Sequence, residues 1–252
     1  MDMELKHKFI DLWSKYFTGA ELPLAFYYTG AKPVEGAIER AEGARCVIAE
    51  LNRARLGKPL FFDNETIGCF GGKRYLGYAR ELMPGFEFFL SCGIPGKMEG
   101  EKYKKTPELV KRIMDIQPLF EAPGKYIVFK RWDTLIESDD PAAVIFFARP
   151  DVLSGLFTLA GFDEEEPSAI YAPFSAGCGS IVQYPYLEIP KEKQKCILGM
   201  FDVSARPFVP QDALSFTAPM KKFTAMVGNM DESFLTTASW EKVRVRIAKA
   251  NQ

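Results

Sequence analysis

Apolar residues recur at three- and four-residue steps at the start of the chain. Leu5, Phe9, Leu12, Trp13 and Tyr16 follow this spacing, which places them on one face of a helix. We therefore expect an N-terminal helix over residues 3–18. A second helical stripe near the other end predicts a C-terminal helix over residues 231–249.

Between these ends, short β-rich apolar runs alternate with longer amphipathic stretches, which is typical of α/β proteins. The predicted strands are residues 22–30, 60–62, 86–90, 126–129, 142–150, 169–171, 196–201 and 214–218. The predicted internal helices are residues 34–56, 106–116 and 151–161. Thr106, Pro107 and Glu108 form a well-marked helix start.

The two halves of the chain show the same order of elements. Each runs strand, helix, glycine, strand, loop and then a Gly-Cys pair, with nine positions from Leu60 to Cys69 and nine from Ala169 to Cys178. This order favours an internal duplication, although coincidence stays open. Strand–helix–strand units pair in parallel. We therefore expect an α/β fold with a mixed, largely parallel sheet, built from two related units with a ligand cleft between them.

The 252 residues predict a single α/β domain, with lobes at about 20–135 and 140–235. Of these residues, 47% are hydrophobic and 26% are charged, which is ordinary for a globular protein. A net charge of −1, from 32 basic and 33 acidic residues, argues against a nucleic-acid partner. No apolar run approaches the roughly 18–20 residues that span a bilayer. We expect a cytoplasmic protein with no membrane partner, and a homo-oligomer stays open.

The counts of cysteine and histidine restrict the chemistry. Five cysteines in a chain of this size predict reduced thiols rather than disulfides. His7 is the single histidine, so Ser-His-Asp and Cys-His nucleophile systems are disfavoured. A metal would have to be held by cysteine and carboxylate groups. Redox or thiol-dependent chemistry is the enzymatic class that remains.

Several segments together resemble a known family. They are RC at 45–46, CFGGKRYLGY at 69–78, an aliphatic strand with Pro-Asp at 144–151, GCGSIV at 177–182 and NMDESFL at 229–235. The chain resembles family 169 of the domains of unknown function, a set of prokaryotic cytoplasmic proteins. The resemblance implies a single α/β unit and cysteine positions that match Cys46, Cys69 and Cys178. It implies no activity.

The two Gly-Cys turns are the candidate ligand site. Glycines around a thiol cost backbone entropy and add no packing, so they suit tight turns or close approach to a ligand. Backbone N–H groups followed by two cations could bind a small anion. The candidate ligand-binding residues are Gly68, Cys69, Gly71, Gly72, Lys73, Arg74, Gly177, Cys178, Gly179 and Ser180.

The thiols are also candidate metal ligands. If the turns face each other, Cys46, Cys69 and Cys178 would converge. With a fourth ligand from Cys92, Asp63 or Glu65, they would suit an iron–sulfur cluster or zinc. The alternative is that the glycines serve turn geometry and the thiols pack in the core, as we expect for Cys196. The protein would then be a non-catalytic sensor or scaffold.

Overall fold

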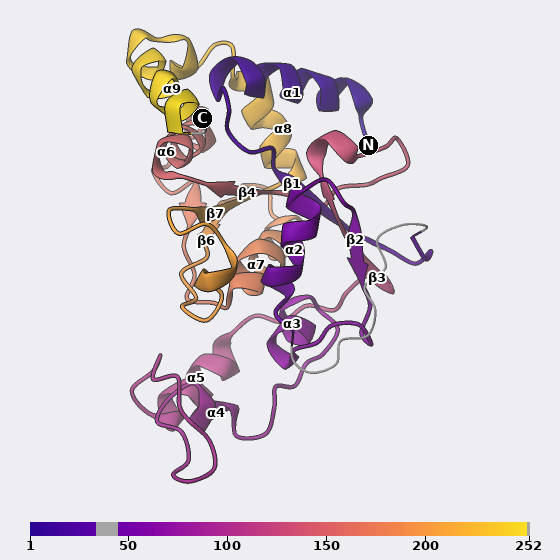
Figure 1. The fold of residues 1–252 in the computed structure, drawn as a ribbon, viewed down its shortest axis with the longest axis vertical. Coiled ribbons are helices and arrows are strands. Elements are labelled where there is room, and N and C mark those ends of the chain that lie inside the picture. Colours follow the sequence, from indigo (N-terminus) through magenta and orange to yellow (C-terminus); the bar gives the residue numbers. More distant parts are fainter. Residues whose placement is uncertain (34–44, 251–252) are drawn as a thin grey trace.

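The computed structural model describes residues 1–33 and 45–250, and a mixed seven-stranded sheet lies at its centre (Figure 1). The strands are β1 (Leu24–Thr29), β2 (Leu60–Phe62), β3 (Tyr126–Arg131), β4 (Ala143–Ala148), β5 (Ile170–Tyr171), β6 (Cys196–Gly199) and β7 (Leu214–Pro219). Their order across the sheet is β2-β3-β1-β4-β7-β6-β5. The pairing of β1 with β4 joins the two halves of the chain in one sheet.

The sheet is mainly antiparallel, so the prediction of largely parallel pairing is wrong. Among the described strands, only β5 and β6 pair in parallel. The strands that a helix connects nevertheless run in the same direction, as a strand–helix–strand crossover requires. β1 and β2 run the same way because both are antiparallel to β3, which lies between them. Likewise, β4 and β5 run the same way, with β7 and β6 between them.

Helices cover both faces of this sheet. On one face lie α1 (Met3–Tyr16), α6 (Pro150–Ala160), α8 (Met220–Asn229) and α9 (Ala238–Ala250). On the other lie α2 (Val47–Arg55), α3 (Phe70–Tyr75) and α7 (Tyr184–Glu188). Because α2 and α6 are on opposite faces, the two strand–helix–strand units differ in arrangement, and their common origin stays a prediction.

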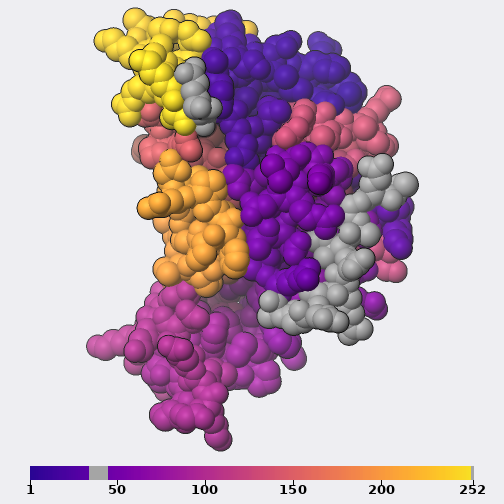
Figure 2. All heavy atoms as spheres, in the orientation of Figure 1, coloured from indigo at the N-terminus to yellow at the C-terminus, as the bar shows by residue number. Residues whose placement is uncertain are grey.

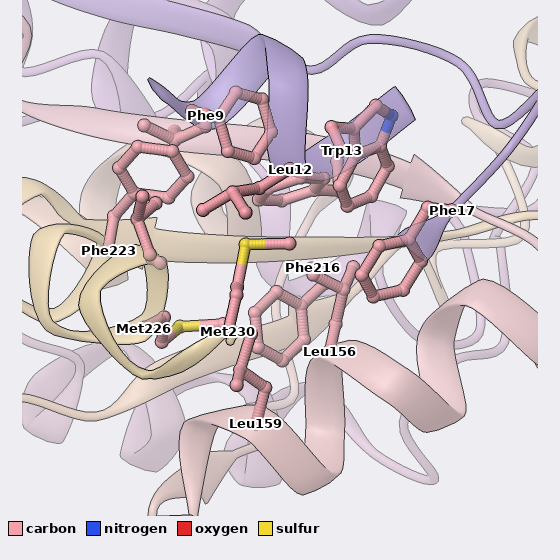
Figure 3. Packing of buried hydrophobic residues seen from close by; sticks show 14 of the residues in the cluster. Phe9, Leu12, Trp13, Phe17, Leu156, Leu159, Phe216, Phe223, Met226 and Met230 are labelled. Atoms are coloured by element: carbon pink, nitrogen blue, oxygen red, sulfur yellow. The ribbon is translucent and has the colours of Figure 1, made fainter. Parts of the chain in front are cut away.

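The face covered by α1, α6, α8 and α9 holds the larger aromatic core (Figure 3). The predicted stripe of α1 supplies Phe9, Leu12 and Trp13, and the Trp13 ring stacks on Phe17 with centroids 4.3 Å apart. Trp132 is fully buried in the same cluster. Burial of each large side chain stabilises the fold by roughly 1.5–3 kcal/mol, so this layer contributes much of the stability.

Most of the other predicted elements form with small shifts at their ends. The helix predicted at 106–116 is α5 (Pro107–Ile116), and the Thr106 side chain accepts a hydrogen bond from the Leu109 amide as its N-cap. The C-terminal helix begins later than predicted, as α9, after a 3-10 turn at Phe234–Thr236. Of the helix predicted at 34–56, residues 34–44 lie outside the described residues, and α2 covers the end. No described helix is long and apolar enough to cross a membrane.

The strand predicted at 86–90 is wrong, because these residues form the short helix α4 (Phe86–Phe89). Gly85 precedes it in a left-handed conformation, with φ of 76°, and its carbonyl accepts the Phe89 amide. Phe86 and Phe89 then pack together at 6.0 Å between ring centroids. The sequence run is apolar enough for a buried strand, but in the structure no strand lies beside it to pair with.

Candidate thiol centre

Three cysteines lie at the starts of three helices on the same face of the sheet. Cys46 is the N-cap of α2 and Cys69 is the N-cap of α3. Cys178 lies in the first turn of a helix that spans residues 177–188. The Cys69 Sγ accepts a hydrogen bond from the Gly72 amide at 3.1 Å. Such amides stabilise a sulfur that carries negative charge.

Glycines let these helix starts pack closely. A Cβ atom added at Gly72 would lie 2.8 Å from the Cys69 Sγ and 2.9 Å from the Val47 side chain, which follows Cys46. One added at Gly177 would lie 3.2 Å from Ile48, in the first turn of α2. The helix that carries Cys178 therefore packs directly on the helix that Cys46 caps.

Gly179 makes the third contact of this kind. A Cβ atom there would lie 3.0 Å from the Tyr75 ring of α3 and 2.0 Å from the Ser175 Oγ. The residues from Gly179 to Gln183 adopt a π-helical conformation, which is often found at functional sites. The three helices that begin at these cysteines are thus in mutual contact, and the structure brings the three thiols close enough to influence one another.

The three thiols influence one another electrostatically. Burial raises the pKa of Cys178 well above its ordinary value, and the charges of Cys69, Cys46 and Asp202 raise it further. Burial also raises the pKa of Cys46, against amide N–H groups at the start of α2, which lower it. Cys69 and Asp202 add to the rise at Cys46. The Cys46 and Cys178 thiols therefore lie close to other groups that can carry negative charge, which disfavours their ionisation.

Asp202 lies in the same site as the three cysteines, although its sequence context did not predict this. Its Oδ2 accepts the Gly177 amide at 3.0 Å, and its Oδ1 accepts the amide and hydroxyl of Ser204. These bonds fix the carboxylate at the start of the helix that carries Cys178. Asp202 follows strand β6, and the carboxyl end of a strand is where α/β sheets often place ligand groups. We call Cys46, Cys69, Cys178 and Asp202 the thiol centre.

The other candidate ligand-binding residues have mixed roles. Arg74 is 5% exposed and donates a hydrogen bond to the Arg80 carbonyl, so it faces the chain rather than solvent. The buried Ser180 hydroxyl donates to the Gly177 carbonyl. Gly68 and Lys73 are half-buried. Gly71 has only ordinary contacts with Tyr75, at 3.7 Å.

The residues proposed as a fourth ligand lie in other surroundings. Cys92 is exposed and lines a hollow of about 460 Å³ in the segment around α4. Asp63 is used in a turn, where its carboxylate accepts the Glu65 and Thr66 amides. Asp63 and Glu65 line another hollow, of about 790 Å³. None of the three cysteines of the thiol centre lines either hollow. Cys196 is fully buried in the opposite core, as expected.

The thiol centre does not present ligands for a single ion. Among residues 1–33 and 45–250, no three or more histidine, cysteine, aspartate or glutamate side chains are arranged to hold one metal ion. A mononuclear zinc site needs its ligands within about 2.0–2.3 Å of the metal. These thiols, as placed, therefore do not form a zinc site.

Two adjacent glycines of α3 test the close packing at the thiol centre. We expect Gly72→Ala to lower the free energy of unfolding by about 1–3 kcal/mol, because its Cβ would press on the buried Val47 and on Cys69. Gly71→Ala is the matched control, and we expect no loss there. Urea unfolding followed by circular dichroism measures both. Equal stability of the two variants would contradict the packing described for Gly72.

A comparison of the sequence with family profiles identifies the family of this chain. The profile of family 169 of the domains of unknown function, described as "Uncharacterised ArCR", matches residues 17–229. The chain belongs to this family. The match includes all of the thiol centre and excludes α1 and α9. No curated protein and no solved structure matches the chain.

Membership in family 169 confirms the resemblance drawn from the cysteine and glycine segments. The profile describes the family as uncharacterised, so it assigns no ligand and no reaction. The chemistry of the thiol centre therefore has to be argued from the geometry of this member.

Proposed function

We propose that the protein binds an iron–sulfur cluster at the thiol centre, through Cys46, Cys69 and Cys178. The observation that carries the proposal is the contact of three short helices, each with a cysteine at its start, around Gly72, Gly177 and Gly179. Thiolate is the usual ligand of iron in such clusters.

The thiol centre suits a cluster better than a single zinc ion. In a four-iron cluster each cysteine binds a different iron, so the thiolates stand farther apart than around one ion. The three thiols influence one another electrostatically, but among the described residues they are not arranged to hold one metal ion. Asp202 is the carboxylate placed to complete the set, since its Oδ2 accepts only the Gly177 amide and retains one lone pair.

The charges of the site support a cationic occupant. Without one, burial and mutual repulsion raise the pKa of Cys178 and of Cys46. A bound cation reverses this balance, because it stabilises the thiolates that burial disfavours. The amide that Gly72 donates to Cys69 stabilises the same charged form.

Small-anion binding is the weaker use of the same residues. The cations that were expected to attract an anion are not presented to solvent together, because Arg74 is buried against the Arg80 carbonyl. The glycines are in contact with neighbouring helices rather than open to a ligand. A soft metal centre accounts for the thiols as well as for the helix packing.

Anaerobic reconstitution with ferrous iron and sulfide tests the proposal. We expect wild type to gain visible absorption and several irons per chain, and Cys69→Ser/Cys178→Ser to retain below about a tenth of that iron. Cys92→Ser removes an exposed thiol outside the centre and is the matched control, with iron equal to wild type. Iron and acid-labile sulfide are measured after desalting.

Two results would count against the cluster. Wild type that stays colourless and free of iron would leave the cysteines as packing residues of a non-catalytic sensor or scaffold. Equal iron in all three proteins would show that the metal binds elsewhere. Circular dichroism of each variant confirms that a loss of iron is not a loss of fold.

A further inference from the structure

Residues 78–121 form an arm that projects from the body next to the thiol centre (Figure 1). None of the residues 79–119 belongs to any of the hydrophobic clusters described for the chain. The arm contains α4, which has no buried residue, and α5, which buries only Val110. An element that shares no core with the body is free to move relative to it at little cost.

The two ends of the arm meet at a narrow neck. The Ala122 amide donates to the Gly77 carbonyl at 2.9 Å, and a Cβ at Gly77 would lie 2.6 Å from that amide nitrogen. Gly77 has φ of 82°, a conformation that suits glycine. Just outside the neck, the Phe120 ring packs on Tyr28 and Tyr186 of the body. The neck is therefore fixed while the arm beyond it is not.

Away from the neck, the arm contacts the body through a few polar groups. The Lys104 Nζ lies 3.6 Å from the centre of the exposed Phe174 ring. The Tyr103 hydroxyl is buried beside Ser204 and Asp202, without a hydrogen bond of good geometry. Nearer the neck, Gln183 donates to the Pro118 carbonyl at 2.7 Å. We call Tyr103 and Lys104 the latch, and each of their contacts is individually weak.

The latch attaches to the loops that hold the thiol centre. Phe174 is four residues before Cys178, and Ser204 binds the same carboxylate of Asp202 that caps Gly177. In Figure 2 the arm, in magenta, meets the orange surface near residue 200. Several buried polar atoms along this seam lack partners, among them the Ser175 Oγ and the Gln117 Oε1. A seam with unpaired polar groups is poorly stabilised when closed.

We infer that the arm is a hinged cover that controls access of small molecules to the thiol centre, with its hinge at the neck and its latch at Tyr103 and Lys104. The body presents the centre, and the arm closes over it from the side of Phe174 and Asp202. The cover does not depend on the identity of the metal, so it is tested on metal-free protein.

Alkylation of Cys178 by iodoacetamide measures the cover, because this thiol is only 7% exposed and lies between the two loops that the latch contacts. We expect Tyr103→Ala/Lys104→Ala to raise the rate of Cys178 alkylation by roughly tenfold. Tyr103→Phe/Lys104→Arg keeps a ring and a cation and should return the rate close to wild type. Peptide mass spectrometry separates Cys178 from the other thiols.

Lys97→Ala/Met98→Ala is the matched control, since it also removes one lysine and one large side chain from the arm. Contacts of Met98 lie within the arm, to Ile94 and Gly85, and the rate should equal that of wild type. An unchanged Cys178 rate in the latch variant would overturn the cover. An equal rise of the alkylation rate in the control would overturn the latch, because substitutions anywhere in the arm would then expose Cys178. Both outcomes are independent of iron binding.

Discussion

Gly155→Ala is expected to lower the free energy of unfolding by about 3 kcal/mol. Gly155 lies in α6, where this helix crosses α9 and the end of α1. An added Cβ would lie 2.3 Å from the Trp240 ring and 2.8 Å from the Phe17 ring. The Trp240 ring cannot withdraw easily, because its Nε1 donates to the Tyr16 carbonyl at 2.9 Å. The overlap therefore outweighs the gain in helix propensity that alanine brings.

Gly228→Ala is the matched control for this prediction. Gly228 is also inside a helix, α8, but among the described residues no atom lies within 4 Å of its Cβ position. We expect a gain of up to about 1 kcal/mol, because alanine favours the helix and meets nothing. Thermal unfolding should show Gly155→Ala lower by roughly 6–12 °C in midpoint. A loss at Gly228 as large as at Gly155 would contradict the helix crossing described.

The helices and strands of this fold were more predictable from the sequence than the order of the strands in the sheet. Periodicity placed α1, α5, α6 and most strands within a few residues of their observed ends, because burial on one face leaves a repeating pattern. The order of strands was not predictable in this way. Nothing local in the runs 60–62 and 126–129 indicates that β3 enters the sheet between β1 and β2. Such pairing depends on contacts between segments far apart in the chain.

The thiol centre was partly predictable for the same reason. The two Gly-Cys segments stood out locally, and the structure brings Cys46, Cys69 and Cys178 into mutual influence. Asp202 did not stand out, because a lone aspartate after a strand has no distinctive spacing. Asp63 and Cys92 were candidates by residue type, and in the structure they line other surfaces.

The glycines of the two Gly-Cys turns allow helices to pack closely, and the sequence alone does not distinguish this role from ligand binding. Gly72, Gly177 and Gly179 each permit close approach, and the approaching groups are Val47, Ile48 and Tyr75 of neighbouring helices. A sequence shows that a position is glycine, but not what lies beside it. Both uses produce the same local pattern, so only the three-dimensional contacts distinguish them.

High pH is expected to destabilise the fold through its buried thiols, one of which is Cys196. Burial raises the pKa of Cys196 to about 12, from an ordinary value of 9.0. Below pH 9 the thiol is protonated in both the folded and the unfolded chain, and its contribution to stability is fully present. As the pH rises from 9 to 12, the unfolded chain binds fewer protons than the folded chain, so unfolding is increasingly favoured.

The expected loss is about 4 kcal/mol over this range, since each pH unit corresponds to roughly 1.4 kcal/mol. By pH 11 it should reach about 3 kcal/mol. Cys196→Ala removes the group and should reduce the fall in stability between pH 8 and pH 11 by that amount. Urea unfolding at several pH values measures the slope, which is independent of the cavity that the substitution leaves. Cys92→Ala, which removes an exposed thiol, should keep the wild-type slope.

Urea unfolding at high pH also tests whether Cys178 binds iron. Burial raises its pKa as well, but the adjacent Cys69 and Cys46 add to the rise, whereas nearby Lys222 opposes it at Cys196. Reconstitution with iron should therefore remove the part of the alkaline slope that belongs to Cys178, because a bound metal keeps that thiol ionised. The part due to Cys196 should remain. An alkaline slope unaffected by Cys196→Ala would contradict the burial on which this prediction depends.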